Sequence, residues 1–210
     1  MNYNWFMAKP INQHAYDKIA NTWHEFRLKS KPNQIIVDLA KQIKPHGTIL
    51  DVGCGTGYPN ADYLAKQGFH VHGIDVSKSM IAIATSLNIP HATFELKDIL
   101  SFHSPKKFDA IIAFDSLFHL DLKDQLTSLT IIAKHLQTHG YFLMTHGKRL
   151  GETTGEMFGE SFYYSSLDAS TYISHLKTLG LTTLTHIEDY QETTTGTRDF
   201  LLIAKKTSTL

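Results

Sequence analysis

The stretch TILDVGCGTG, residues 48–57, decides the fold. Its first half, Thr48–Val52, is a short and mostly apolar run that is typical of a buried strand. Gly53, Gly55 and Gly57 follow at two-residue spacing, so the backbone can turn sharply and approach a ligand with no side chain in the way. A helix after such a turn directs its free N–H groups at whatever binds there. The stretch therefore predicts a strand, a ligand-binding turn and a helix, although a turn that only packs the strand against the helix would also use these glycines.

Two familiar phosphate-binding motifs fit this turn poorly. A dinucleotide fingerprint would have a glycine at position 58, which is Tyr58. The Gly-Lys-Ser/Thr run of a phosphate-binding loop does not follow either. A nicotinamide-dependent oxidoreductase is therefore the weaker alternative for a sheet of this kind.

Strands and helices alternate along most of the chain. The predicted strands after the glycine-rich turn are Phe69–Ile74, Ala92–Leu96, Phe108–Phe114, Tyr141–Thr145, Leu181–Ile187 and Asp199–Lys205. The predicted helices are Asn12–Leu28, one that begins after Pro32, Tyr58–Gln67, one after Ser77, one after Asp121 that closes near Gly140, and Asp168–Leu179. The Thr193–Thr197 stretch has the composition of a turn between the last two strands. This alternation predicts an α/β fold with a doubly wound, mostly parallel sheet and helices on both faces.

Acidic residues follow two of the predicted strands, where ligands of such sheets bind. Asp75 ends the second strand, and its carboxylate could accept hydrogen bonds from both hydroxyls of a ribose, with Val76 and Met80 beside a flat base. Asp98, with Ile99 next to it, follows the third strand and could accept a hydrogen bond from an exocyclic amine. Taken alone, each acid could equally be a helix cap or a solvated loop residue.

Together these residues resemble class I S-adenosylmethionine-dependent methyltransferases of the small-molecule type. Asp51–Gly57 is similar to the glycine-rich motif of that family, Asp75 to its ribose-binding acid, Asp98 to its adenine-contacting acid and Phe108–Leu120 to its fourth-strand motif. The resemblance implies a Rossmann-like, seven-stranded sheet with an antiparallel last strand. It also implies S-adenosyl-L-methionine as the cofactor and S-adenosyl-L-homocysteine as the product.

The cofactor contacts that the resemblance implies come from the strand ends and from the first helix. Tyr16 and Trp23 in that helix resemble residues that close over the cofactor, although their helical spacing equally suits core packing. The remaining expected contacts are Asp51, Gly53, Cys54, Gly55, Gly57, Asp75, Val76, Met80, Asp98, Ile99, Phe114, Asp115 and Ser116. We interpret Cys54 as a small packing residue of the turn.

The methyl acceptor is less well defined by the sequence. His119, after the fourth strand, and His146, at the end of the fifth, are the candidate general bases, although a lone histidine is more often structural. The fourth strand is followed by Asp115-Ser116-Leu117-Phe118, not by the Asn/Asp-Pro-Pro-aromatic tetrad of enzymes that methylate nucleobase or glutamine nitrogens. We therefore expect a small or medium-sized acceptor. Because only Asp115 is well placed to ligate a metal, we expect no metal.

The connection Gly147–Ser166 is longer than an ordinary loop. Because it follows the carboxyl end of a strand, we expect a lid that selects the substrate, with Phe162, Tyr163 and Tyr164 in contact. The expected organisation is a single domain: a helical cap (1–46), a cofactor-binding core (47–146), a substrate or lid loop (147–167) and a C-terminal helix with two strands (168–210).

The composition limits the partners and the location. The 210 residues include 20 basic and 20 acidic side chains, so the formal net charge is zero, which disfavours a broad nucleic-acid-binding surface. The single cysteine allows no intrachain disulfide and suits a reducing cytoplasm. No apolar run is long enough to span a membrane, and the first residues lack the pattern of a signal peptide. We expect a cytoplasmic enzyme without membrane or nucleic-acid partners. The non-catalytic alternative is a domain that binds the cofactor without turnover. The sequence does not define the oligomeric state.

Overall fold

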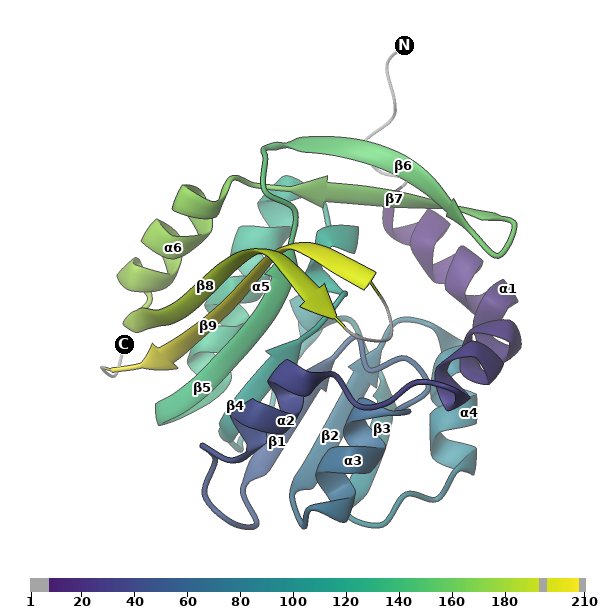
Figure 1. Cartoon of the computed structure of the whole chain (residues 1–210), viewed down its shortest axis with the longest axis horizontal. Coiled ribbons are helices and arrows are strands. Elements are labelled where there is room, and N and C mark those ends of the chain that lie inside the picture. The colour runs from purple at the N-terminus through teal and green to yellow at the C-terminus, as the bar shows by residue number, and fades with distance from the viewer. Residues whose placement is uncertain (1–7, 193–195, 208–210) are drawn as a thin grey trace.

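The computed structural model describes residues 8–192 and 196–207, and its centre is a seven-stranded sheet with the order β3-β2-β1-β4-β5-β9-β8 (Figure 1). The strands are β1 (Thr48–Val52), β2 (His70–Asp75), β3 (Ala92–Leu96), β4 (Phe108–Ala113), β5 (Leu136–His146), β8 (Leu181–Glu192) and β9 (Gly196–Lys206). Neighbouring strands from β3 to β5 pair in parallel, whereas β9 runs antiparallel to both β5 and β8. The predicted sheet, mostly parallel with an antiparallel last strand, is confirmed.

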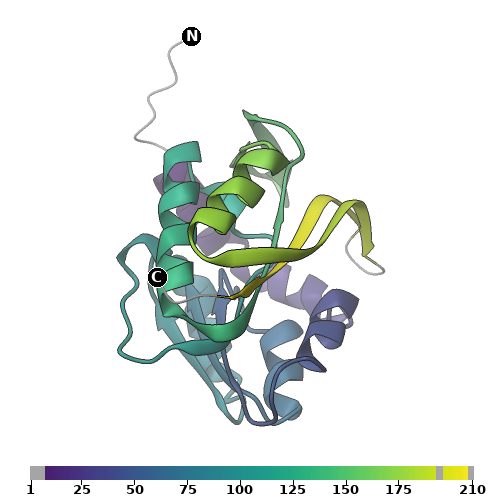
Figure 2. The ribbon, with the colours of Figure 1, turned by 90° about the vertical axis from the view of Figure 1, so that its left-hand side faces the viewer.

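Helices cover both faces of the sheet, as Figure 2 shows from the side. They are α1 (Ala8–Leu28), α2 (Gln34–Ala40), α3 (Asn60–Lys66), α4 (Lys78–Ser86), α5 (Leu122–His135) and α6 (Ala169–Thr178), with short 3-10 helices η2 (Ile99–Ser101) and η3 (Leu117–His119). Side chains alternate across β4, so that Ile111 packs in the cluster with α5 and α6 while Ile112 packs with α2 and α3. This two-sided burial explains the nearly continuous apolar sequence of β4. Among the described residues, no helix combines the length and apolar character needed to cross a membrane.

Side-chain caps start several helices where the sequence predicted them. The Ser77 hydroxyl accepts a hydrogen bond from the Met80 N–H at 3.1 Å, and Asp121 caps α5 in the same way. Asp17 of α1 accepts hydrogen bonds from the Ser77 hydroxyl (2.6 Å) and from the Ser79 N–H (2.9 Å). These bonds fix α1 to the start of α4, above the carboxyl end of β2.

Some element boundaries differ from the predictions. Helix α3 begins at Asn60 instead of Tyr58, because Pro59 occupies the N-cap position. Helix α5 ends at His135 and not near Gly140, and β5 follows immediately. The Lys206 ammonium group donates hydrogen bonds to the carbonyls of Ala133 (2.5 Å) and Leu136 (3.2 Å), which satisfies the end of α5 at this point. The last two strands are also longer than predicted, and residues 193–195 of the expected turn between them lie outside the described residues.

The expected loop at 147–167 is instead largely a β-hairpin. Strands β6 (Gly151–Met157) and β7 (Glu160–Ser166) pair antiparallel in a separate two-stranded sheet, with Phe158 and Gly159 at the turn. The hairpin extends across the top of the molecule in Figure 1 and reaches α1. Phe162 packs there against Ala15 and Ile19 of α1, so the hairpin is anchored by apolar burial. The expected loop was wrong because β6 is polar and glycine-rich, with no apolar alternation to mark it as a strand that could pair with β7.

Candidate active site

A cavity of about 720 Å³ lies at the carboxyl ends of β1 to β4. Helix α1 and the hairpin of β6 and β7 complete its walls. Every residue predicted to contact a cofactor lines it: Tyr16, Trp23, Asp51, Gly53, Cys54, Gly55, Gly57, Asp75, Val76, Met80, Asp98, Ile99, Phe114, Asp115 and Ser116. The fold thus brings the first helix and four strand ends to one space.

The glycine-rich turn forms one wall of this cavity. Gly53, Gly55 and Gly57 have φ angles of 74°, 55° and 74°, a region that glycine adopts without strain. A Cβ atom on Gly53 would lie 2.4 Å from the Cβ atom of Ser116, so a side chain there would collide with the segment after β4. A Cβ atom on Gly55 would have the Trp23 ring nitrogen, at 3.6 Å, as its nearest neighbour. The turn therefore packs tightly on one side and leaves main chain open to a ligand on the other.

Two carboxyl groups lie beside this turn. Asp75 accepts hydrogen bonds from the N–H groups of Gly55 (2.9 Å) and Ser77 (2.8 Å), which leaves lone pairs for a ligand. Burial raises the pKa of Asp75, and these hydrogen bonds oppose the rise. Burial, followed by the charge of Asp75, raises the pKa of Asp51 to about 7. A cationic ligand group nearby would favour the ionised form of both acids.

Ser116 and Cys54 are two small residues of the cavity wall. The Ser116 hydroxyl oxygen is buried and has no hydrogen-bond partner among the described residues, although the residue lines the cavity. A buried hydroxyl usually has a partner, so this oxygen suits a polar ligand group. Burial raises the pKa of the Cys54 thiol well above its usual range, which keeps the thiol protonated and favours the packing role.

Arg27 is a cation of α1 that the sequence interpretation missed. It lines the cavity, is only 7% exposed, and its guanidinium lies 5.7 Å from the centre of the Trp23 ring. Burial lowers its pKa, and the negative charge of Asp115 opposes the change. No carboxylate in the described part of the chain forms an ion pair with Arg27. Because a buried charge without a paired counter-charge is costly, this position suits an anionic ligand group.

Asp115 is held from two neighbouring strands. The Arg198 guanidinium of β9 donates from Nε to both carboxylate oxygens (2.6 and 2.8 Å) and from Nη2 to Oδ2 (2.5 Å). The Thr145 hydroxyl of β5 donates to Oδ1 at 3.0 Å and accepts the Asp115 N–H at 2.8 Å. Asp115 and Arg198 therefore form a rigid, charge-balanced part of the cavity wall.

Tyr16 and His119 form a hydrogen-bonded pair in the cavity. The Tyr16 hydroxyl lies 2.8 Å from Nε2 of His119, and Nδ1 of His119 lies 2.9 Å from the carbonyl oxygen of Tyr163. Because a carbonyl only accepts, Nδ1 carries the proton and Nε2 accepts the hydrogen bond from Tyr16. Burial lowers the pKa of His119 to about 4 and raises that of Tyr16 well above its usual value, so both groups are uncharged at neutral pH.

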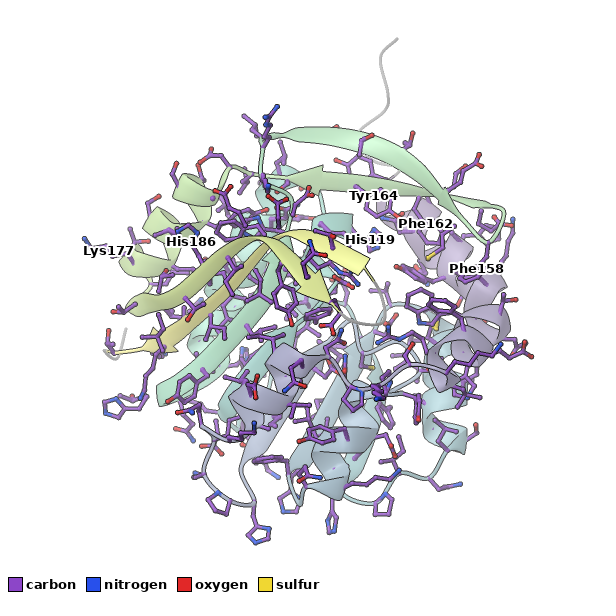
Figure 3. All side chains as sticks on the ribbon, in the orientation of Figure 1. His119, Phe158, Phe162, Tyr164, Lys177 and His186 are labelled. Atoms are coloured by element: carbon purple, nitrogen blue, oxygen red, sulfur yellow. The ribbon has the colours of Figure 1, made fainter. Side chains whose placement is uncertain are left out.

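Of the three predicted substrate contacts, only Tyr164 lines this cavity. Figure 3 shows Tyr164, Phe162 and His119 gathered where the hairpin meets α1. Phe162 is fully buried, and its ring centre is 4.8 Å from that of Tyr16, so it is a core residue under the pair. The side chain of Tyr163 leaves the opposite face of β7, since successive strand residues alternate, and only its backbone reaches the pair. Both residues are therefore corrections to the expected substrate contacts.

His146 does not reach the cavity. It is 3% exposed, with ring centres 4.0 Å from Tyr172 and 4.1 Å from Phe200, and it lines a neighbouring cavity of about 660 Å³. The geometry therefore gives His146 no part as a base in the main cavity. The described residues also contain no group of three or more His, Cys, Asp or Glu side chains placed to hold a metal ion.

The sequence interpretation also missed Asn12, Phe158 and Arg198, which line the cavity. Asn12 and Arg27 lie four residues from Tyr16 and Trp23, two predicted residues that also line the cavity, so the helix period could have indicated both. Phe158 and Arg198 gave no comparable signal, because their positions depend on how the hairpin and β9 pair with the rest of the molecule.

A protein-family model described as a methyltransferase domain matches residues 23–187, which is most of the chain. The chain belongs to this methyltransferase family. The matched residues include the glycine-rich turn, Asp75, Asp98 and the segment after β4. Because the chain belongs to the methyltransferase family, the alternative of a nicotinamide-dependent oxidoreductase is set aside.

Curated relatives of the chain carry methyltransferase names. It is 32% identical over 149 residues to phosphoethanolamine N-methyltransferase 1 of Arabidopsis thaliana, covering 67% of this chain and 30% of that protein. It is 28% identical over 146 residues to a ubiquinone biosynthesis O-methyltransferase of Hydrogenovibrio crunogenus, covering 64% and 59%. An uncharacterized methyltransferase of Alkaliphilus oremlandii is 36% identical over 101 residues, covering 48% and 46%. The chain thus spans less than two thirds of each of these relatives.

Solved structures share the fold. An amino pentose methyltransferase of Micromonospora echinaspora, solved with S-adenosylmethionine bound, has a TM-score of 0.68 at 17% identity over 90% of this chain and 96% of that one. The N-methyltransferase NodS of Bradyrhizobium japonicum, solved with S-adenosylhomocysteine, has a TM-score of 0.63 at 20% identity over 83% and 85%. These likenesses establish the Rossmann-like methyltransferase fold.

Proposed function

We propose that this member of the methyltransferase family binds S-adenosylmethionine and transfers its methyl group to a small or medium-sized molecule. The observation that carries the proposal is one continuous cavity that joins the glycine-rich turn and Asp75 to the Tyr16–His119 pair. Two structural neighbours with the same fold were solved with S-adenosylmethionine or its demethylated product bound. Relatives named as methyltransferases for phosphoethanolamine nitrogen and in ubiquinone biosynthesis support the acceptor size.

The residues of the cavity fit the separate parts of this cofactor. Asp75 retains lone pairs for the ribose hydroxyls, and Asp98, whose Oδ1 caps η2, can accept a hydrogen bond from the adenine amine. The buried Arg27 guanidinium suits the carboxylate of the amino-acid end. Asp51 and the unpartnered Ser116 hydroxyl suit its ammonium group. The carboxylate and the ammonium group of the amino-acid end thus each have a complementary group in the wall.

The cofactor, when bound, supplies a methyl group already activated by a sulfonium, so the protein mainly has to align the acceptor and exclude water. The Tyr16 hydroxyl donates its own proton to His119 and keeps lone pairs that can accept a hydrogen bond from an O–H or N–H of the acceptor. Such a bond would point the lone pair of the acceptor atom into the cavity. Once a hydroxyl oxygen carries the methyl group, its proton is strongly acidic. His119 can therefore receive a proton from Tyr16 while Tyr16 takes that of the acceptor, even with a pKa of about 4.

The proposed acceptor is neither a nucleic acid nor a membrane lipid surface, and the proposed location is the cytoplasm. The formal net charge of zero supports the first point, because phosphate-backbone binding depends on clustered basic residues. The partly enclosed, aromatic-lined space beside Tyr164 and Phe118 supports an acceptor that is largely buried when bound.

Calorimetric titration of the folded protein with S-adenosylmethionine and with S-adenosylhomocysteine tests the proposal. We expect both to bind, and a labelled methyl donor to transfer label to components of a metabolite extract. Absence of heat with both ligands would contradict cofactor binding. Binding without transfer to any component would favour the non-catalytic alternative.

A further inference from the structure

We propose that Asn12 is a positioning residue that joins the hairpin to the Tyr16–His119 pair, so that one amide side chain both closes the acceptor side of the cavity and aligns the pair. The inference rests on the proposed function for its catalytic consequence. Its structural part concerns three elements that are far apart in the sequence: α1, η3 and β7.

The amide of Asn12 pairs with β7 as a neighbouring strand would. Its oxygen accepts the Tyr163 N–H at 2.8 Å, and its nitrogen donates to the Tyr163 carbonyl at 2.9 Å. Strand β6 pairs with the other edge of β7, so without Asn12 these two backbone groups would be left on an open edge. The side chain is 4% exposed, so water does not readily replace it. Asn12 thus joins the hairpin to α1 through hydrogen bonds.

The same amide also reaches η3. Its nitrogen lies 3.2 Å from the carbonyl oxygen of His119 and 3.2 Å from Nδ1 of that ring. Because the His119 ring and the Asn12 nitrogen both donate to the Tyr163 carbonyl, this one oxygen fixes the orientation of both side chains. Loss of Asn12 would therefore free the carbonyl that holds the ring and its tautomer.

The helix period also places Asn12 close to Tyr16. Asn12 and Tyr16 are four residues apart in α1 and so lie on the same face, one turn apart. The Tyr16 ring rests edge-on against Phe162 of β7 and against His119, with ring centres at 4.8 and 5.4 Å. The seating of the hairpin and the hydrogen bond between Tyr16 and His119 thus depend on the same alignment of α1.

Hydrogen exchange and the titration of the His119 ring, both followed by NMR, test the structural part without any acceptor. In Asn12→Ala we expect the Tyr163 amide to exchange about tenfold faster, the scale of one lost hydrogen bond. We also expect the midpoint of the His119 titration to fall further below the ordinary value near 6.5, because the protonated ring loses a firmly held hydrogen bond to the Tyr163 carbonyl that raises its pKa. Asn12→Asp keeps the size and an oxygen that can accept the Tyr163 N–H, so exchange of this amide should stay near the wild-type rate. Because it cannot donate to either carbonyl, it should still change the His119 titration. Asn21→Ala, an exposed change in the same helix outside the cavity lining, should show neither.

The catalytic part is read separately. With an acceptor in hand, both Asn12 variants should lower kcat and alter its pH profile while the affinity for S-adenosylhomocysteine stays within about twofold, because the proposed cofactor contacts are elsewhere. Wild-type exchange at Tyr163 together with a wild-type His119 titration in a folded Asn12→Ala protein would overturn the inference. Amide exchange and the His119 titration need no turnover. A failed methyltransferase assay would therefore count against the proposed function and not against the structural role of Asn12.

Discussion

At the scale of single residues, Arg27 tests which part of the cavity binds the amino-acid end of the cofactor. The Arg27→Met variant keeps the apolar stem that packs on Trp23 and removes the charge. If the guanidinium binds the carboxylate of the amino-acid end, S-adenosylhomocysteine should bind about 1.5–3 kcal/mol more weakly, or roughly ten- to hundredfold. Calorimetry with 5′-methylthioadenosine, which lacks that carboxylate, should give equal affinities for the variant and the wild type. An equal loss for both ligands would mean that Arg27 only supports the fold.

Asp51 predicts a pH dependence of cofactor binding. Its pKa of about 7 means that the empty site holds a partly protonated acid at neutral pH. A ligand ammonium group favours the ionised acid, so affinity for S-adenosylhomocysteine should rise with pH, by up to about tenfold per unit, until it levels off above pH 7. In Asp51→Asn the affinity should be lower above pH 7 and nearly flat between pH 6 and 7.5. Parallel slopes in the two proteins would assign the dependence to Asp75 or to another group.

The residues that the sequence could identify are those whose neighbours are set by local chain geometry. Asp75 and the glycines follow directly from the ends of strands, so their convergence needs only a parallel sheet. Asn12 and Arg198 act through partners more than 80 positions away, His119 and Asp115 respectively. No spacing rule connects such pairs, so the partners of these two residues can be seen only in the assembled fold, although the helix period places Asn12 on the face of Tyr16.

At the scale of elements, the hairpin is where sequence and structure diverge most. Its strands carry many polar and glycine residues, so β6 lacks the apolar alternation that marks a strand. Strand β7 does alternate, with Phe162 buried and Ser161 exposed, but its partner cannot be inferred alone. The early end of α5 is similar, since a carbonyl of its last turn accepts a hydrogen bond from the Lys206 ammonium group at the far end of the chain. Long apolar strands and capped helices were predictable because their causes are local.

The hairpin turn makes its own prediction through Phe158. This ring is 45% exposed, yet it contacts Trp23 and Phe26 of α1 with ring centres at 6.4 and 5.9 Å. Aromatic pairs of this kind contribute about 0.5–1.5 kcal/mol. If the hairpin turn restricts the exit of the cofactor product, Phe158→Ala should speed dissociation of S-adenosylhomocysteine by about two- to tenfold in stopped-flow experiments. Thr154→Ala, an exposed change in β6 outside the cavity, serves as the control. Equal dissociation rates in Phe158→Ala and wild type would show that this turn is not a barrier.

At the scale of the whole molecule, two buried histidines and the buried Asp51 make the free energy of unfolding depend on pH in opposite directions. Burial lowers the pKa of both His119 and His146 to about 4, against about 6.5 for an unfolded histidine. Below pH 6.5 these histidines bind protons in the unfolded chain but stay neutral in the folded chain. Each histidine therefore contributes stability that is complete above pH 6.5 and is lost as the pH falls toward 4. Asp51 acts in the opposite direction. Its raised pKa lets the folded protein keep a proton that the unfolded chain releases, so its contribution weakens as the pH rises from about 4 to 7.

Urea unfolding of the unliganded protein at pH 7 and pH 5 separates these contributions. In His146→Gln the stability lost between pH 7 and pH 5 should be about 2 kcal/mol smaller than in wild type, whatever the overall cost of losing the ring packing on Phe200. In Asp51→Asn the same acidification should cost about 2 kcal/mol more than in wild type, because the compensating proton uptake is gone. His14→Gln, a change at an exposed position of α1, should leave the difference unaltered. If His146→Gln and Asp51→Asn shift the pH difference in the same direction, the opposition between these buried groups is refuted.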